Sequence, residues 1–487
     1  MAIPSAADIA ALARGGRVNF VGFLLRLMAR LPFLVIAGRL YGAEDLGRFA
    51  YATMVVELAA AVAVVGLRRG LAAELANNRG PETHVIADAL LLSVLLATVA
   101  SCLLIAAPLL MFPGGVDAAF EPYFALIIFA IVLSDVSLAA MAFRHRIDAQ
   151  VRARSLIEPW SLTIAAVALT FTPLKGNGLL IAYLVSLVAA CAASLVPAWR
   201  LFGWPQGWRP SFRRMIAIVA RNLPLAGADI IEWATRRVDI FILGRFAPPE
   251  TVGVYYVAQQ VATLAGKVRS SFDPILAPML ASALVRGERA LAAAHVRQVG
   301  FWVLAFQLPI VLAMGLPAEG VLGLFGPAFA VGGLVLTLLL LTELVAASAS
   351  LSEMALIYAR PRANLAISAL GIGAQAGLCL LLVPRFGAEG AALGLLLSLV
   401  LVAFAKQLLL AHDLGAPVAL WRWSLLVVAV PTFGFGYALR QLPELPQMLV
   451  TVPGTLLLFG VLIWHFGFAP ADRVLFGRGA PGKRREE

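Results

Sequence analysis

The sequence has few charged residues and few cysteines. Asp, Glu, Lys and Arg make up 13% of the 487 residues, and three residues are cysteines. A soluble domain usually carries about 25% charged residues, so an ordinary soluble enzyme is excluded. Cys102, Cys191 and Cys379 lie far apart in apolar segments, where we expect small packing residues and no disulfide or metal site. The histidines also lack metal-ligand spacing.

Apolar residues dominate instead, at 61% of the chain, with a mean hydropathy of +0.91. A membrane helix needs about 20 apolar residues, and continuous apolar runs favour helices over an alternating β-barrel. The sequence therefore predicts an all-α polytopic membrane protein. About fourteen spans are expected near residues 18–38, 49–67, 87–112, 123–142, 159–174, 178–198, 222–244, 252–275, 300–325, 332–358, 364–383, 388–411, 423–439 and 447–468.

Basic residues outnumber acidic ones, 38 to 27. In a soluble chain this excess would suggest a nucleic-acid partner, but in a membrane protein Lys and Arg mark the cytoplasmic loops. If both termini are cytoplasmic, 25 Lys and Arg residues fall on the cytoplasmic side and 6 on the other. Arg68, Arg69, Arg154 and Lys406 are among the 25. The count predicts cytoplasmic termini, an even number of spans and no nucleic-acid partner.

An internal repeat divides the chain. The segment from Gly38 to Ala59 recurs from Gly244 to Ala265, with seven identities in a 22-residue window at a constant offset of 206. Six spans per unit keep both copies in one orientation, so the repeat is parallel, about an axis along the membrane normal. The predicted domains are an N-lobe (1–207), a C-lobe (208–412), and a C-terminal helix pair with a basic tail (413–487).

Charges at membrane depth are costly and usually functional. The first span contains Arg26 and Arg30, and Arg30 lies too deep for its side chain to extend to the interface. The alternative is that a neighbouring carboxylate neutralises Arg30. The offset of 206 aligns Arg30 with Arg236. Matching cations in both lobes, facing a midplane cavity, would suit an anionic substrate.

The seventh span carries five charged residues, Asp229, Glu232, Arg236, Arg237 and Asp239. All except Arg237 fall within an arc of about 80° on a helix, so this stripe must face another helix or a water-filled cavity. The alternative is that Glu232 and Arg236 simply neutralise each other as an i,i+4 pair. Asp229, Glu232 and Asp239 are the candidate sites for a coupling ion.

Other charges at membrane depth are less informative. Lys267 and Arg269, near Asp273 in the eighth span, are open equally to substrate binding and to snorkelling toward the interface. Four membrane carboxylates are predicted to be isolated, each able to hold a coupling proton or to bond a Ser or Thr neighbour: Glu57, Asp135, Glu343 and Glu353.

Four short segments are typical of one family: RLYGAEDLG (39–47), VDIFILG (238–244), VGVYY (252–256) and PRFGAEGAA (384–392). With the fourteen spans, the six-plus-six repeat and the charged first and seventh helices, the chain resembles the polysaccharide-biosynthesis flippases of the multidrug/oligosaccharidyl-lipid/polysaccharide exporter superfamily. The resemblance implies a Wzx-type flippase, not an enzyme. Such a flippase moves an undecaprenyl-diphosphate-linked oligosaccharide across the bacterial inner membrane for O-antigen, exopolysaccharide or capsule synthesis.

The resemblance also implies roles for particular residues. Arg26, Arg30 and Arg236 would line a central cavity, and the final helix pair at 421–468 would hold the lipid tail. Arg237, Lys267 and Arg269 complete the candidate substrate-binding set. No cofactor is implied beyond proton or sodium coupling, and the implied partners are the lipid-linked substrate, membrane lipids and the polysaccharide polymerase machinery. Arginine suits a diphosphate because it binds phosphate oxygens with bidentate, charge-assisted hydrogen bonds.

Three alternatives stay open at this stage. A lipid II flippase would share the polyprenyl-diphosphate chemistry. A multidrug exporter of the same superfamily would more often have twelve spans and fewer arginines at membrane depth. A membrane-embedded glycosyltransferase or O-antigen ligase would typically carry a sizeable catalytic loop outside the membrane, whereas the predicted outside loops are short.

Overall fold

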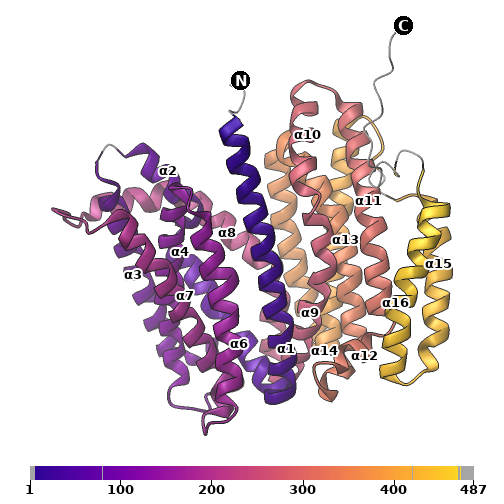
Figure 1. Ribbon diagram of the computed structural model, residues 1–487, viewed down its shortest axis with the longest axis horizontal. Coiled ribbons are helices and arrows are strands. Elements are labelled where there is room, and N and C mark those ends of the chain that lie inside the picture. Colours follow the sequence, from indigo (N-terminus) through magenta and orange to yellow (C-terminus); the bar gives the residue numbers. More distant parts are fainter. Residues whose placement is uncertain (1–5, 79, 419–420, 470–471, 473–487) are drawn as a thin grey trace. The chain divides into compact units, whose positions relative to one another are not determined.

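The computed structural model describes residues 6–78, 80–418, 421–469 and 472, with side chains from Arg30 onward except at 274–275 and 444–445. Every regular element in these residues is a helix (Figure 1). The α-helices are α1 (Ala6–Val64), α2 (Leu67–Asn77), α3 (Glu82–Ala106), α4 (Ile127–Phe143), α5 (Ile147–Gln150), α6 (Glu158–Leu169), α7 (Gly178–Phe202), α8 (Phe212–Phe246), α9 (Pro249–Ser270), α10 (Asp273–Val285), α11 (Arg289–Gly315), α12 (Ala318–Gly323), α13 (Gly333–Ala359), α14 (Pro361–Leu414), α15 (Trp423–Ala438) and α16 (Glu444–Leu462).

Two of these helices each contain a sharp break. Gly42 in α1 has φ 88° and ψ 179°, and Gly387 in α14 has φ 54° and ψ −128°. A positive φ strains residues with a Cβ, so glycine is the residue expected at both points. Each long helix therefore comprises two membrane-crossing helices joined by a one-residue turn.

The number of membrane helices agrees with the hydropathy pattern. Nine segments of the described chain are long and apolar enough to cross a membrane, and Arg30–Asn77 and Pro361–Leu414 are the two that contain a glycine break. Adding the shorter or more polar α6, α8 and α9 brings the count to fourteen helices. The prediction of an all-α polytopic membrane protein is confirmed.

The described chain forms two compact units, residues 1–253 and 254–487. In the first unit, α4 packs against α3 and α7, and α1 packs against α4, α6 and α8. Leu34, Leu46 and Met54 of α1 are fully buried in this unit. The predicted lobes 1–207 and 208–412 were defined by the sequence repeat, whereas the two compact units are defined by contacts between residues. The lobes therefore remain a prediction.

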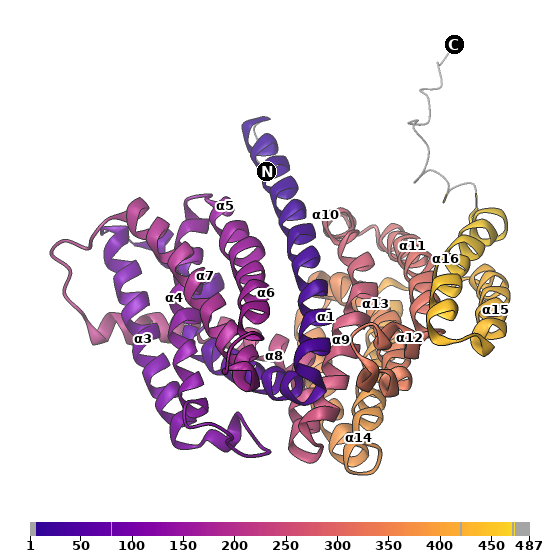
Figure 2. The ribbon, with the colours of Figure 1, turned by 60° about the horizontal axis from the view of Figure 1, so that its bottom comes forward.

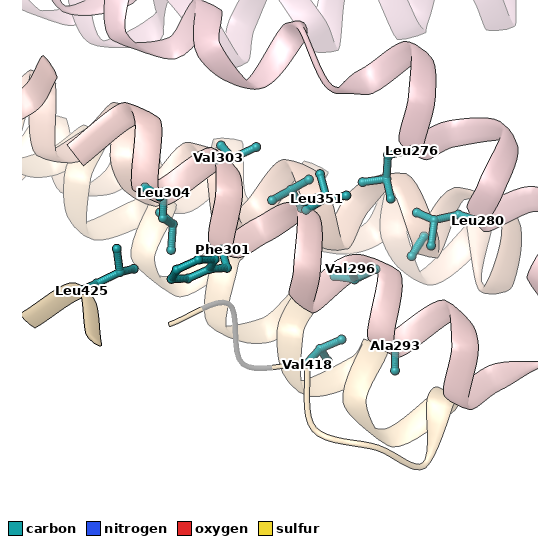
Figure 3. Close-up of a cluster of buried hydrophobic side chains, with 14 of the residues drawn as sticks. Leu276, Leu280, Ala293, Val296, Phe301, Val303, Leu304, Leu351, Val418 and Leu425 are labelled. Carbon is teal, nitrogen blue, oxygen red and sulfur yellow. The ribbon is translucent and has the colours of Figure 1, made fainter. Parts of the chain in front are cut away.

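The second unit is organised around α11, which packs against α10, α13 and α16. Figure 3 shows its core, with Phe301 of α11 lying near Leu304 and Leu425. Leu425 at the start of α15 joins the same cluster. The first helix of the C-terminal pair is therefore packed into this unit.

Candidate functional site

The charged stretch of α8 lies against α2, within the first unit. The α2 helix begins directly after Gly66, so Arg68 and Arg69 occupy its first turn. Glu74 in the next turn binds α8 through Arg221, with N–O distances of 2.9 and 2.6 Å. Asn222 donates a further hydrogen bond to Glu74 over 3.0 Å. These contacts fix α2 alongside α8 and direct Arg69 toward the carboxylates of α8.

Arg69 bridges two carboxylates, and the three groups together keep one formal negative charge. Its Nε lies 3.0 Å from Asp229 Oδ1 and its terminal nitrogen lies 2.6 Å from Glu232 Oε2. The Asp229 side chain is only 10% exposed, so it requires a partner. Arg69 was predicted to lie in the cytoplasmic connection between the second and third spans; this connection contains the helix α2, through which Arg69 reaches α8. Arg69 is the principal partner of the acidic face of α8.

Arg236 forms only a long ion pair in this arrangement. Its guanidinium lies 3.6 Å from Glu232 Oε1, and its side chain is 69% exposed. An exposed i,i+4 pair contributes only about 0.3–0.5 kcal/mol, and Glu232 already binds Arg69 over a shorter distance. Glu232 and Arg236 therefore form the i,i+4 pair considered above only weakly, and Glu232 shares it with Arg69. The arginine keeps most of its capacity to bind an anion.

Arg30 is also exposed, on the first part of α1. Within the described residues Arg30 forms no ion pair, so the neutralising carboxylate considered above is absent from this part of the chain. Arg26 belongs to the same helix, but its side chain lies outside the described residues. The offset of 206 still pairs Arg30 with Arg236, and both present exposed guanidinium groups.

Arg237 points to a different cluster from Arg236. Its terminal nitrogen lies 3.8 Å from Glu57 Oε2 on α1, and Tyr183 of α7 donates a hydrogen bond to Glu57 Oε1 over 3.1 Å. Glu57 is therefore not isolated, contrary to the sequence analysis. Because Arg237 is three-quarters buried and engaged by a carboxylate, it is better suited to holding α8 on α1 than to binding a substrate.

The candidate ion-coupling carboxylates differ in their surroundings. Asp229 and Glu232 are bound by Arg69, whereas Asp239 is fully buried in α8. The described residues contain no cluster of three or more His, Cys, Asp or Glu side chains suited to a metal ion.

Lys267 and Arg269 belong to the second unit, in the last turn of α9. Lys267 is exposed and Arg269 is half-buried. Asp273 begins α10 directly after this turn. These positions are compatible with either of the roles considered above, substrate binding or snorkelling.

The comparisons with known proteins agree with a transporter fold. Residues 12–283 match the family described as polysaccharide biosynthesis protein. The chain belongs to this family. No curated protein matches the chain. At the level of structure, this polysaccharide biosynthesis protein is similar to the lipid II flippase MurJ in its inward closed conformation. The TM-score is 0.72 at 12% identity, over 92% of this chain and 99% of that one.

Two further structural relatives are transporters of the MOP superfamily. A multidrug resistance MATE family transporter in its inward-facing conformation gives a TM-score of 0.63 at 16% identity, over 80% of this chain and 94% of that one. A MOP superfamily transporter from Pyrococcus furiosus Vc1 (DSM3638) gives 0.54 at 17% identity, over 83% and 95%. At such identities the likeness concerns the fold, which is that of a multi-pass membrane transporter.

The protein also contains a largely buried arginine that was not predicted from the sequence. Arg154 lies in a π-helical segment, Val151–Ile157, and its side chain is 17% exposed. It bonds Asp135 of α4, and it donates to Glu158 Oε2 over 2.8 Å. Arg154 was counted as loop charge because the fifth span was predicted to begin at residue 159. Its i,i+4 spacing from Glu158 is the signal that could have revealed the pair.

The second unit has a buried ion pair of its own. Lys406 of α14 is 3% exposed, and its Nζ lies 3.0 Å from Glu353 Oε2 and 3.0 Å from Ser368 Oγ. Glu353 was predicted to be isolated, which is wrong, and Lys406, counted among the cytoplasmic-side charges by loop, lies within α14 and not in a loop. Asp135 and Glu57 are likewise paired, because each lies within reach of an arginine from another helix.

Proposed function

We propose that this protein is a flippase for polyprenyl-diphosphate-linked oligosaccharides, acting by alternating access at the bacterial inner membrane with both termini in the cytoplasm. The family and the structural relatives support a transporter of this general class. A diphosphate-sugar head group is too polar to cross hydrocarbon unaided. The protein must therefore offer it cations within the bilayer.

One observation carries the proposal. Arg69 binds Asp229 at 3.0 Å and Glu232 at 2.6 Å, so Arg236, at 3.6 Å from Glu232 and 69% exposed, balances the one remaining negative charge of the cluster without being held in a short ion pair. A cation in this setting can bind phosphate oxygens without first breaking a strong ion pair. Arg30 would supply the corresponding cation from the first repeat, with Arg26 one turn earlier.

Coupling to a proton or sodium gradient is part of the proposal, and Asp229, Glu232 and Asp239 remain its candidate sites. Release of Asp229 from Arg69 would free a carboxylate for a cation, and this would link ion binding to movement of α2 against α8. The products would be O-antigen, exopolysaccharide or capsule, with polysaccharide polymerase machinery as the consumer of the flipped substrate.

The proposal is tested with the purified full chain in proteoliposomes, by measuring the outer-leaflet exposure of a polyprenyl-diphosphate oligosaccharide. Arg236→Ala is expected to abolish flipping at normal protein level, and Arg236→Lys to restore it partly, because lysine keeps the charge but loses the planar fork. Adding Glu232→Gln to Arg236→Ala is expected to give no recovery. Full recovery in that double variant would reduce Arg236 to a charge-balancing role and would contradict the phosphate-binding site.

A second substrate, lipid II, distinguishes the proposed function from that of a lipid II flippase. The MurJ likeness favours lipid II as a competing candidate, and lipid II carries the same diphosphate. The same proteoliposomes loaded with lipid II should show slower flipping than with the oligosaccharide substrate. Faster flipping of lipid II would assign the protein to that substrate instead, while transport of drug cations by wild type would favour a multidrug exporter.

A further inference from the structure

The connection between α7 and α8 carries an unusual combination of aromatic and basic side chains. Trp199 and Trp204 stack with their ring centroids 4.6 Å apart, and both are exposed. Phe212 at the start of α8 is 76% exposed. Figure 2 shows this connection as a loop near α3 in the first unit. Large aromatic groups are not usually left in water at this density.

The connection is held in place by contacts with α3. Asp88, almost fully buried, accepts a hydrogen bond from Trp208 Nε1 over 2.9 Å and pairs with Arg214 Nε at 2.8 Å. His84 Nε2 lies 3.0 Å from the Gln206 carbonyl oxygen. With these residues turned inward, the Trp199–Trp204 stack and Phe212 are left facing outward.

Three arginines accompany the outward-facing aromatic residues. Arg200, Arg209 and Arg213 are exposed, and none of them forms an ion pair with a described residue. The nearby carboxylates form ion pairs with other arginines: Glu82 binds Arg144, and Asp88 binds Arg214. The surface therefore presents positive charge with no internal counter-charge.

We propose that this surface, formed by Trp199, Arg200, Trp204, Arg209, Phe212 and Arg213, binds the head groups of anionic phospholipids. Tryptophan settles at the membrane–water interface, where its ring meets hydrocarbon and its N–H meets the head groups, and Phe212 adds apolar surface beside it. Arginine beside them pairs with lipid phosphate, and an anionic leaflet strengthens this attraction. Because the connection joins the two repeats, its lipid contacts anchor the first residues of α8 at the bilayer surface.

The test uses the full chain in bilayers of phosphatidylcholine mixed with phosphatidylglycerol, one of the two lipids being brominated. Bromine quenches tryptophan fluorescence on contact, and subtracting a Trp199→Phe/Trp204→Phe variant isolates the signal of the stack. Brominated phosphatidylglycerol is expected to quench this signal more than brominated phosphatidylcholine at equal fraction. Equal quenching by the two lipids would overturn the proposal.

Charge variants then assign the preference to the three arginines. Changing Arg200, Arg209 and Arg213 to Gln should reduce the preference for phosphatidylglycerol about fivefold per arginine, since each basic side chain at an anionic surface contributes about 1 kcal/mol. The matched control changes Arg245, Arg385 and Arg440 to Gln, which removes the same charge elsewhere and should leave the preference intact. An equal loss in both variants would show a net-charge effect only and would overturn the site.

A salt titration of the wild-type protein provides a measurement that needs no variant. The preference for phosphatidylglycerol should weaken as ionic strength rises, because exposed charges are screened over a Debye length of about 10 Å at 0.1 M salt. A preference that is insensitive to salt would also contradict the proposal.

Discussion

Arg69 on α2 binds Asp229 on α8 with an Nε–Oδ1 distance of 3.0 Å, although 160 residues separate them in the sequence. The pair joins the connection after α1 to the helix that opens the second repeat. Because Asp229 is the more buried partner, the arginine chiefly compensates a carboxylate that has little access to water.

The Arg69–Asp229 pair predicts that stability lost by removing the arginine is recovered by also removing the charge of the aspartate. Arg69→Ala should destabilise the protein by about 1–3 kcal/mol, because Asp229, which is only 10% exposed, loses its ion-pair partner. Adding Asp229→Asn should recover most of that loss. Thermal unfolding of the single and double variants in detergent provides the measurement, and a double variant as unstable as Arg69→Ala would show that the pair is not the source of the effect.

The Lys406–Glu353 pair predicts a different asymmetry. Lys406 is 3% exposed whereas Glu353 is 40% exposed, so removing the carboxylate strands the more buried charge. Glu353→Gln should therefore cost more stability than Lys406→Met, and the double variant should be close to wild type. The same unfolding assay decides the order. Equal effects of the two single variants would contradict the burial argument.

A close crossing within the first unit predicts two sensitive glycines. A Cβ on Gly47 would lie 1.8 Å from the Pro249 carbonyl oxygen, and a Cβ on Gly253 would lie 2.0 Å from the Ala43 carbonyl oxygen. These contacts are related by the offset of 206. Gly47→Ala and Gly253→Ala should each destabilise by about 1–3 kcal/mol, because backbone must move. Thermal unfolding measures this loss.

The control for this pair is Gly227→Ala. Gly227 is also helical, but a Cβ there would meet nothing within 4 Å. Alanine should be neutral or slightly stabilising at that position, since it lowers the entropy of the unfolded chain. A destabilisation at Gly227 as large as at Gly47 would remove the packing explanation.

Asp472 predicts a dependence of stability on pH. Burial raises the pKa of Asp472, but hydrogen bonds from Gln298, the Ala469 amide and Trp302, together with the charge of Arg422, outweigh it and lower the pKa below 3.8. A carboxyl group whose pKa is lower in the folded state than in the unfolded state stabilises the fold at pH values above its unfolded pKa. That stability is lost as the pH falls through the folded-state pKa.

The test for this prediction compares wild type with Asp472→Asn across a pH series. Wild type should be the more stable form at pH 7, and the difference should shrink at pH values below 3.8, where the carboxylate becomes protonated. Thermal unfolding in detergent reports both curves. A constant difference at all pH values would mean that the charge of Asp472 does not contribute.

The charge pattern of the loops predicts the position of the C-terminus. A reporter that is active only outside the cytoplasm should be silent when fused after Glu487. The same reporter fused after Gly176, in a predicted outer loop, should be active. Activity after Glu487 would reverse the predicted topology.

Hydropathy was sufficient for the fold class, and apolar runs read together with charged and turn-forming breaks were sufficient for the number of helices. A segment that crosses hydrocarbon must satisfy its backbone within itself and must be apolar over about 20 residues, and both requirements are local. The repeat and the charged face of α8 were visible for the same reason, since Asp229, Glu232 and Arg236 are related by helical spacing. Boundaries were less accurate where charges enter the bundle, as at Arg154.

Only the tertiary structure decided which charges neutralise one another. Arg69, Arg154 and Lys406 resemble loop charges in the sequence because each stands at the edge of an apolar run. In the folded chain Arg154 and Lys406 are buried and Arg69 is half-exposed, and each meets a carboxylate from another helix. A buried charge is tolerated only when its partner is within a few ångströms, and partners distant in sequence reach that distance through helix packing.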